Sequence, residues 1–257
     1  MVRNKTQITT CIIPAAGKGS RWAPISGYLP KEMLPLIDKP VIHWVIDEVI
    51  DSGCTKIIVV INNSKEIVKE YLSKQKFGKN IKIHYVYQDK PKGVAHVIYL
   101  SKKYLDSKPF ALAMPDLPTI SKKPALLQLI KVSKSYKNVN IISFDKFPPQ
   151  DLKLYGECEL DKIDKNIFNV VAFRKSKLNL RMSGRFIFQP NVISTIKPLL
   201  KSTKCEVSDQ DLLKKSLNLG EKIIGVKIQG RTYDTGTPTG YVRANTAFFK
   251  KKFNITS

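Results

Sequence analysis

The sequence has few cysteines, and none of them sits in a metal-binding or disulfide-forming arrangement. The four cysteines among 257 residues are scattered, with no Cys-x-x-Cys motif and no histidine pair beside them. This distribution argues against a zinc site and against a disulfide framework. We therefore expect a protein of a reducing compartment, the cytoplasm.

Long apolar runs are missing as well. No stretch approaches the roughly 18 to 20 apolar residues that a membrane-spanning helix needs. No long apolar segment follows the charged residues at the N-terminus, so we expect neither a secretory signal nor a membrane partner. Hydrophobic residues make up 42% of the chain and charged residues 25%, and this balance indicates a globular protein rather than a disordered or fibrous one.

Acidic residues are scarce relative to basic ones. Asp plus Glu number 21 against 44 Lys plus Arg, which gives a net charge of +23. Such an excess attracts polyanions such as nucleic acid. However, only seven of the 44 are arginine, the residue that base-edge and phosphate recognition favours, and the lysines are spread along the whole chain. We therefore interpret the excess as a Lys-rich solvated surface, not as a nucleic-acid interface, and the sequence does not explain why the chain is so Lys-rich.

The first half of the chain alternates between apolar strands and amphipathic helices. Continuous apolar runs predict buried strands, and apolar residues at helical spacing predict the helices between them. The predicted strands are 9–15, 56–62, 81–88, 110–115 and 139–144, and the predicted helices are 40–52, 65–74, 94–105 and 125–136. This alternation is typical of βαβ units that form a mostly parallel sheet with helices on both faces.

The pattern changes after the proline pair at 148–149. Short strands are predicted at 156–160, 167–173 and 185–188, then a helix at 209–219, a strand at 222–228 and a closing helix at 239–252. The chain has no internal repeat and no low-complexity linker. We therefore predict one α/β domain over residues 1–257, with a mixed sheet whose later elements complete the site.

A glycine-rich turn follows the first predicted strand. Small residues there allow backbone amides to close around an anion. The dinucleotide fingerprint is not met, because Trp22 stands where the third glycine should be, and the P-loop pattern fails because Gly19 stands where Ser or Thr is required. We predict that the turn binds phosphates by another scheme. Its candidate residues are Ala15, Ala16, Gly17, Gly19 and Ser20.

Downstream residues make this turn part of a longer signature. Arg21 and Pro24 follow the turn, Pro-Lys-Glu-Met-Leu-Pro occupies residues 30–35, and Asp-Lys-Pro occupies residues 38–40 and leads into a predicted helix. This combination resembles the signature of the sugar-nucleotide pyrophosphorylases, specifically that of the bacterial-type UTP–glucose-1-phosphate uridylyltransferases.

The resemblance extends over most of the chain. Further matching segments are Gln88 to His96, Met114-Pro115-Asp116, Tyr155-Gly156, Phe173 to Ser176, Asn179 to Arg185, Glu206 to Asp211 (against Glu-Ile-Gln-Leu-Thr-Asp in the family) and Tyr233 to Gly236. The resemblance implies a Rossmann-like, three-layer αβα nucleotidyltransferase fold of the glycosyltransferase-A type, with a mostly parallel mixed sheet. It also implies a nucleotide-binding half at about 1–120 and a sugar-binding half at about 121–257.

The implied reaction is the Mg²⁺-dependent transfer of a uridylyl group from UTP to glucose 1-phosphate, which gives UDP-glucose and pyrophosphate. Asp116 and Asp234 would hold Mg²⁺, which prefers oxygen ligands and is commonly bound by one or two carboxylates plus substrate phosphates. Arg21 and Lys31 would neutralise the β and γ phosphates as pyrophosphate leaves, and Lys175 would hold the phosphate of the sugar. The in-line attack needs no covalent enzyme intermediate, so catalysis would rest on positioning and electrostatics.

The remaining roles are also implied by the resemblance. Gln88 and Gly93 would contact the nucleobase. The expected sugar-binding residues are Tyr155, Gly156, Arg174, Asn179 and Glu206.

Three positions depart from the family pattern. Ser20 replaces Thr and keeps the hydroxyl, whereas Gly27 replaces a Lys and removes a cation near the triphosphate. Arg174 stands in place of a Glu that hydrogen-bonds sugar hydroxyls. Because a guanidinium only donates where a carboxylate only accepts, the sugar contacts cannot be the same. The acceptor is then another sugar phosphate, for example one with an acidic group, or the neighbouring strand is shifted in register.

Two alternatives therefore stand beside the leading hypothesis. One keeps the reaction but uses dTTP or a different sugar 1-phosphate, since uracil and thymine present the same hydrogen-bonding edge. The other is a non-catalytic protein on this fold that binds nucleotide sugars or nucleic acid. The sequence speaks against the second, because Arg21, Lys31, Asp116 and Asp234 are all present. The oligomeric state, a homo-oligomer included, and the pathway stay open.

Overall fold

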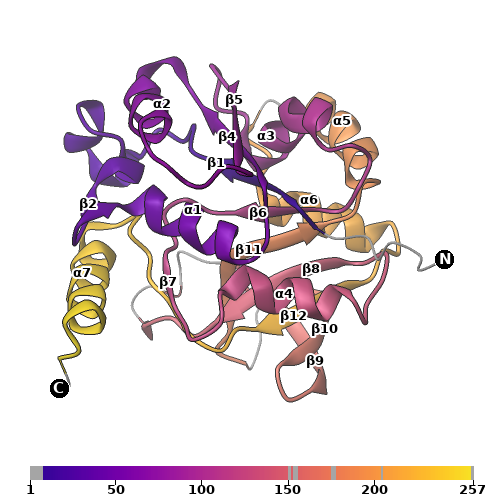
Figure 1. The fold of residues 1–257 in the computed structure, drawn as a ribbon. Helices are drawn as coiled ribbons and strands as arrows, with labels where there is room; N and C mark the ends of the chain where they lie inside the picture. The colour runs from indigo at the N-terminus through magenta and orange to yellow at the C-terminus, as the bar shows by residue number, and fades with distance from the viewer. Residues whose placement is uncertain (1–7, 150–151, 153–155, 175–177, 204, 256–257) are drawn as a thin grey trace.

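A computed structural model describes residues 8–149, 152, 156–174, 178–203 and 205–255. Within them, nine strands form one sheet in the order β5–β4–β1–β6–β11–β8–β12–β10–β9 (Figure 1). The strands are β1 Thr10–Pro14, β4 Lys56–Ile61, β5 Lys82–Tyr87, β6 Phe110–Ala113, β8 Asn140–Asp145, β9 Glu159–Asp164, β10 Ile167–Ala172, β11 Arg181–Phe188 and β12 Ile223–Lys227. Two-residue strands form two further pairs, β2 (Pro35–Leu36) with β3 (Lys39–Pro40) and β7 (Thr119–Ile120) with β13 (Arg231–Thr232).

Most strands of the large sheet run in one direction. The pairs β5–β4, β4–β1, β1–β6 and β8–β12 are parallel. Strand β11 is antiparallel to both β6 and β8, and β10 is antiparallel to both β12 and β9. Only β11 and β10 therefore oppose the other seven strands of this sheet, which confirms the predicted mostly parallel mixed sheet.

Helices cover both faces of the sheet. Strand β1 shows how the faces divide: Ile12 contributes to the core on one face, and Cys11 and Ile13 to the core on the other, as strand alternation requires. Side chains of α3 (Gly93–Ser101), α5 (Val192–Ser202) and α6 (Asp209–Asn218) fill the first core. Side chains of α1 (Val41–Asp51), α2 (Glu66–Ser73) and α4 (Ala125–Ser133) fill the second. The expected three-layer αβα fold is confirmed.

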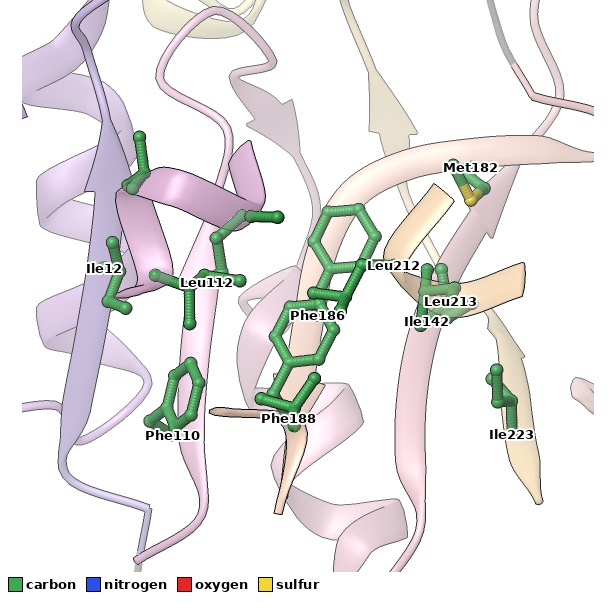
Figure 2. Packing of buried hydrophobic residues seen from close by; sticks show 14 of the residues in the cluster. Ile12, Phe110, Leu112, Ile142, Met182, Phe186, Phe188, Leu212, Leu213 and Ile223 are labelled. Carbon is green, nitrogen blue, oxygen red and sulfur yellow. The ribbon is translucent and has the colours of Figure 1, made fainter. Parts of the chain in front are cut away.

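The first core is dense with aromatic rings where β6 meets β11. Phe110 of β6 and Phe186 and Phe188 of β11 are almost completely buried, beside Leu212 and Leu213 of α6 (Figure 2). The Phe110 and Phe188 ring centroids lie 5.8 Å apart. This packing fixes the antiparallel strand β11 between β6 and β8, next to the site described below.

The closing helix α7 (Pro238–Phe253) lies outside the three layers (Figure 1). It begins after Thr237, whose side chain accepts a hydrogen bond from the Gly240 N–H, and Pro238 occupies the first turn, where no N–H partner is needed. Its buried residues Ala244 and Phe248 join a third core cluster that includes Trp22 and Leu36. The helix thus packs against the segment that follows the glycine-rich turn.

Several predicted elements differ in extent. Strand β11 begins at Arg181, four residues before the prediction, because the polar start Arg-Met-Ser-Gly reads as a turn although all eight residues of the strand are buried. Helix α5 was not predicted, and it contains Pro198, a residue that argues against a helix interior. The predicted strand 156–160 is represented by β9, which forms a hairpin with β10. The described residues include no helix with both the length and the apolarity to cross a bilayer.

Candidate active site

A cavity of about 510 Å³ opens at the carboxyl ends of β1 and β6. Ligands of open α/β sheets bind at this edge, because the loops that follow parallel strands gather there. Twelve of the residues proposed from the sequence line it: Ala16, Gly17, Gly19, Ser20, Arg21, Lys31, Gln88, Gly93, Asp116, Gly156, Glu206 and Asp234. Ala15, Arg174 and Asn179 do not line it, and Tyr155 and Lys175 lie outside the described residues.

The glycine-rich turn begins at the end of β1. The Ala15 N–H donates to the carbonyl of Val60 at 2.7 Å, so this residue still belongs to the sheet and its amide is not available to a phosphate. The Asn62 side chain donates to the Ala16 carbonyl at 2.8 Å and fixes the start of the turn. Gly19 has a φ of 68°, a left-handed conformation that glycine adopts without strain. Any contact between a phosphate and the backbone amides of this turn would therefore begin after Ala15.

The two proposed metal ligands converge on one point above Gly236. A methyl group placed on Gly236 would lie 2.8 Å from Asp116 Oδ2 and 2.8 Å from Asp234 Oδ1. It would lie 3.4 Å from a guanidinium nitrogen of Arg21. Only a residue without a side chain leaves room for both carboxylates there. The structure therefore brings together two acids that are 118 positions apart in the chain.

Backbone contacts hold these two acids in register. The Thr235 N–H and hydroxyl both donate to the Asp116 carbonyl, each at 2.9 Å. The Trp22 indole donates to the Thr235 carbonyl at 3.0 Å, which ties the same loop to the segment after the glycine-rich turn. The antiparallel pair β7–β13 begins directly beyond. The two acidic loops and the cationic segment thus form one hydrogen-bonded unit.

Two cations accompany the acids. The Lys31 ammonium contacts Asp116 Oδ2, and Arg21 Nη1 lies 3.7 Å from Asp234 Oδ2. Burial disfavours the Lys31 charge, but the carboxylates of Asp116 and Glu32 outweigh it and raise the Lys31 pKa. Burial likewise opposes the Asp116 charge, yet the nearby Lys31 ammonium keeps the pKa of this carboxyl below its ordinary value. Both groups are therefore charged at neutral pH.

A buried ion pair behind Lys31 was not found from the sequence. Lys65 Nζ lies 2.7 Å from Glu32 Oε2, and both side chains are buried. Burial lowers the Lys65 pKa, while the Glu32 carboxylate opposes that shift. Because Glu32 directly follows Lys31, this pair anchors the short 3₁₀ turn Lys31–Met33 that aims Lys31 at Asp116. Nothing in the sequence indicated that Lys65 would be buried and would pair with Glu32.

A second buried pair supports the Asp116 loop. Arg185 of β11 donates from Nε to Glu48 Oε1 at 3.0 Å and from Nη2 to Glu48 Oε2 at 2.7 Å. The same Nη2 donates to the Leu117 carbonyl at 2.9 Å, and Nη1 donates to the Gly184 carbonyl at 3.2 Å. The pair therefore joins α1, β11 and the loop that carries Asp116.

Gln88 and Gly93 occupy a second side of the cavity. The Gln88 Nε2 donates to the Gly93 carbonyl at 3.2 Å and faces His96 Nδ1 at 3.0 Å. Burial, and then the charge of Lys92, lower the His96 pKa, so this ring is neutral at pH 7 and can accept at Nδ1. With its amide donors used inside the protein, Gln88 keeps its carbonyl oxygen for an N–H donor in the cavity.

Gly93 also joins this side to the segment that carries Glu206. Its φ is 82°, and a methyl group there would lie 2.2 Å from the Val207 carbonyl oxygen. The Val207 N–H donates to the Lys92 carbonyl at 3.0 Å, and the Ala95 N–H donates to the Val207 carbonyl at 3.1 Å. The requirement for glycine at position 93 is therefore one of close backbone approach.

The third side is formed by residues of the sugar-binding half. Gly156 and Glu206 lie there, together with Asp209, which the sequence analysis did not single out. Burial, with a smaller contribution from the Asp211 carboxylate, raises the pKa of the Asp209 carboxyl to about 6. Arg174 is exposed instead, and its Nε contacts Glu159 Oε2 of β9 at 2.5 Å. Asn179 is also exposed, so neither residue lies in the cavity.

The donor set near Gly236 fits a magnesium ion held together with substrate phosphates. Asp116 and Asp234 supply converging carboxylate oxygens, the ligand type that Mg²⁺ prefers. Among the described residues no cluster of three or more His, Cys, Asp or Glu could hold a metal on its own. Two carboxylates with the remaining positions left to phosphate and water are the common arrangement for this ion in phosphoryl-transfer sites.

The "Nucleotidyl transferase" family model matches residues 10–251 of the chain. The chain belongs to the nucleotidyl transferase family. The match includes the glycine-rich turn, both acidic loops and all of α7 except its last two residues. The family membership and the cavity together identify this nucleotidyltransferase as an enzyme.

The names of two individual relatives agree with this family assignment. A Bacillus subtilis (strain 168) protein, named as a candidate UTP–glucose-1-phosphate uridylyltransferase, is 30% identical over 260 residues, which cover 92% of this chain and 95% of the relative. A second protein of the same strain, a UTP–glucose-1-phosphate uridylyltransferase, is 26% identical over 268 residues, 94% of this chain and 91% of the relative.

A solved structure of UDP-glucose pyrophosphorylase complexed with UDP-glucose has the same fold as this nucleotidyltransferase. The TM-score is 0.84 at 26% identity, and the match covers 95% of this chain and 100% of that one. These comparisons identify the chain as a sugar-1-phosphate nucleotidyltransferase that is similar to UDP-glucose pyrophosphorylases.

Proposed function

We propose that this enzyme transfers a uridylyl group from UTP to glucose 1-phosphate, with Mg²⁺, and releases pyrophosphate. The observation that carries the proposal is the convergence of Asp116 and Asp234 above Gly236, with Lys31 and Arg21 beside them. Two anionic substrates must approach each other in this reaction, so their charge must be cancelled before attack. The site supplies cations and metal-binding oxygens at one place for that purpose.

Some of these residues would bind the substrates, and others would compensate the negative charge of the phosphates. The turn from Ala16 to Ser20 would hold the triphosphate through backbone amides. Arg21 and Lys31 would stabilise the negative charge that develops on pyrophosphate as it leaves. A bound Mg²⁺ would polarise the phosphoryl oxygens and orient them for in-line displacement. Asp116 and Asp234 would fix its position, and Lys175 would hold the sugar phosphate.

The hydrogen bonds of Gln88 favour uracil or thymine as the base of the nucleotide substrate. Its carbonyl oxygen is left to accept from a ring N–H because its amide group is used by Gly93 and His96. Uracil and thymine carry that donor at N3, whereas cytosine and adenine carry an acceptor at the corresponding ring nitrogen. dTTP therefore remains the second candidate donor, and the same assay separates it from UTP.

The reducing cytoplasm remains our proposed location. The four cysteines are free thiols, and Cys11, Cys54 and Cys158 are buried. Burial raises the pKa of the Cys158 thiol to about 12, so this thiol stays protonated and unreactive at neutral pH. Such thiols suit a compartment where disulfides do not form.

The test is a pyrophosphate-release assay with five nucleoside triphosphates, each paired with glucose 1-phosphate. We expect turnover with UTP, loss of turnover on chelation, and recovery with added Mg²⁺. Asp116→Asn should lower kcat by about 10³-fold or more, since metal stabilisation of the transition state is worth several kcal/mol. Asp161→Asn on exposed β9 is the matched control and should behave like the wild type. Full activity of Asp116→Asn, or equal turnover with every base, would contradict the proposal.

A further inference from the structure

The charges that line the cavity are unevenly distributed. Lys18, Arg21 and Lys31 line the side that carries the glycine-rich turn and the two metal-site acids. The side formed by Gly156, Met182 and residues 206–210 carries charge only from Glu206 and Asp209, among the described lining residues. A phosphate therefore fits the first side, and the group that faces the second side meets carboxylates.

Asp209 is held firmly in that position. It is the first residue of α6, and Ser208 and Asp211 form a capping box around it. The preceding Val207 is joined to the start of α3 by its two backbone hydrogen bonds. On the other side, a methyl group on Gly156 would lie 3.0 Å from the Gln210 side-chain oxygen and 3.2 Å from Met182. The first turn of α6 is thus packed from two directions.

The Asp209 carboxyl has no cationic partner among the described residues. Arg174, the cation that the sequence suggested for the sugar site, is bound to Glu159 at the exposed hairpin instead. A half-buried carboxylate without a cation gains most from a hydrogen-bond donor on a ligand, because burial has already removed part of its water. Position 209 carries Leu in the family motif quoted above, so this carboxylate is a feature of this chain.

We propose that Asp209 is a specificity residue for the sugar: its carboxylate accepts a hydrogen bond from a hydroxyl group of a neutral hexose 1-phosphate and rejects uronic acid 1-phosphates. This inference rests on the proposed nucleotidyl transfer and names the class of its acceptor. Rejection follows from charge, since the carboxylate of a uronic acid would face both Glu206 and Asp209 in a partly desolvated site. The acidic acceptor that Arg174 suggested from the sequence is therefore not the expected one.

The first test compares acceptors. Asp209→Asn removes the charge at nearly constant size, and Asp209→Leu introduces the residue of the family motif. We expect Asp209→Asn to raise the KM for glucose 1-phosphate about 10-fold, the size of one hydrogen bond to a charged group, with an unchanged KM for UTP. The ratio of kcat/KM for glucuronic acid 1-phosphate to that for glucose 1-phosphate should rise by at least 10-fold. Asp161→Asn should change neither quantity.

The second test does not depend on turnover. Titration calorimetry with UDP-glucose and UDP-glucuronic acid measures the preference of the wild type and of both variants for the neutral sugar. We expect the preference to shrink in Asp209→Asn and Asp209→Leu, while the affinity for UMP stays the same as a check on the nucleotide side. An unchanged preference, with normal binding of UMP, would overturn the role of Asp209.

The two proposals fail in different ways. If the wild type turns over UTP with glucose 1-phosphate but Asp209→Asn keeps the same acceptor selectivity, only the Asp209 inference is wrong. If the wild type releases no pyrophosphate and binds neither UDP-sugar, the proposed function is wrong, and the inference that rests on it is overturned as well.

Discussion

Arg185 and Glu48 form a fully buried, two-pronged ion pair between residues that are 137 positions apart in the chain. The contact is made where β11 crosses behind the Asp116 loop, and Arg185 also donates to two carbonyls there. Glu48 accepts in addition from the Leu126 N–H at 3.1 Å, at the start of α4. Three structural elements and the loop that carries Asp116 therefore depend on a single pair of side chains.

Removal of one partner of this pair should destabilise the protein strongly. Glu48→Gln leaves the Arg185 charge buried without its counter-charge, which costs about 3–5 kcal/mol of unfolding free energy. Urea unfolding followed by circular dichroism measures the loss. The double variant Glu48→Leu/Arg185→Met should recover part of it, limited by the carbonyls that lose their donor. Glu70→Gln, which breaks an exposed pair with Lys74, is the control; a Glu48→Gln variant as stable as that control would contradict the prediction.

Lys31 should affect turnover much more than binding. Its ammonium contacts Asp116, and in the proposed reaction it would lie where the leaving phosphates gain charge. Lys31→Met should lower kcat by about 10²- to 10³-fold, the cost of removing one preorganised electrostatic contact, with a small change in the KM for UTP. Steady-state kinetics with the exposed-site variant Lys103→Met as control measures the split. A rise in KM with kcat unchanged would show instead that Lys31 binds substrate and transition state equally.

Gly236→Ala should weaken metal binding without a large effect on folding. The added methyl would lie 2.8 Å from both carboxylates, which must separate to admit it. We expect the Mn²⁺ affinity, measured by titration calorimetry in the presence of UTP, to fall about 10-fold or more, as for other disturbances of ligand orientation. Gly27→Ala has nothing within 4 Å of its new methyl and serves as control. Equal Mn²⁺ affinity of the two variants would argue against this metal site.

The Asp209 carboxyl gives a pH-dependent stability that can be measured directly. Burial raises its pKa to about 6, from the ordinary value of 3.8, and the neighbouring Asp211 adds to the shift. The folded state therefore binds a proton that the unfolded state has lost between about pH 4 and pH 6, so this group's contribution to stability falls as pH rises through that window. The backbone amides of Asp209 and Gln210 oppose the shift. The Asp209 carboxylate also acts on the buried Cys158 thiol, whose other charged neighbours are Arg181, Glu157 and Lys214.

Asp209→Asn removes this dependence. Relative to the wild type, the variant should gain unfolding stability from pH 4.5 to pH 7, by at most about 3 kcal/mol for a shift of this size. Urea unfolding at the two pH values, with Asp161→Asn in parallel, gives the difference. A constant stability difference between wild type and Asp209→Asn across the window would show that the pKa of Asp209 is not raised.

Much of the fold followed from local patterns in the sequence. The strands that became β1, β4, β6 and β8 are mostly apolar runs because helices cover both of their faces, and such runs are easily recognised in a sequence. Strand β11 was too short in the prediction, because its first residue, Arg181, is buried through an ion pair with Glu157, and only tertiary contacts make an arginine a core residue. The buried Lys65–Glu32 pair was not predicted for the same reason, because it too depends on tertiary contacts.

The site was predicted best where backbone geometry constrains residue type. Glycine is required at positions 19, 93 and 236 by a positive φ or by the close approach of neighbouring atoms. Such a requirement fixes the residue type, so it can be recognised as a sequence motif. Contacts between side chains were harder to predict from the sequence. Arg174 stands at the position of a family Glu but lies at an exposed hairpin with Glu159 as its partner. Asp209 was not predicted, because one acidic residue at a helix start is ordinarily a cap.

The backbone hydrogen bonds that join Val207 to Lys92 and Ala95 have a consequence for how this enzyme can change. The wall that we propose for the base and the wall that we propose for the acceptor are joined by main-chain hydrogen bonds, which do not depend on the identity of the side chains. Substitutions at residues 206, 209 and 210 can therefore alter the chemistry of the acceptor wall while the geometry of the base wall is kept. In this architecture, the selectivity for the acceptor can therefore change by substitution without a change in the selectivity for the base.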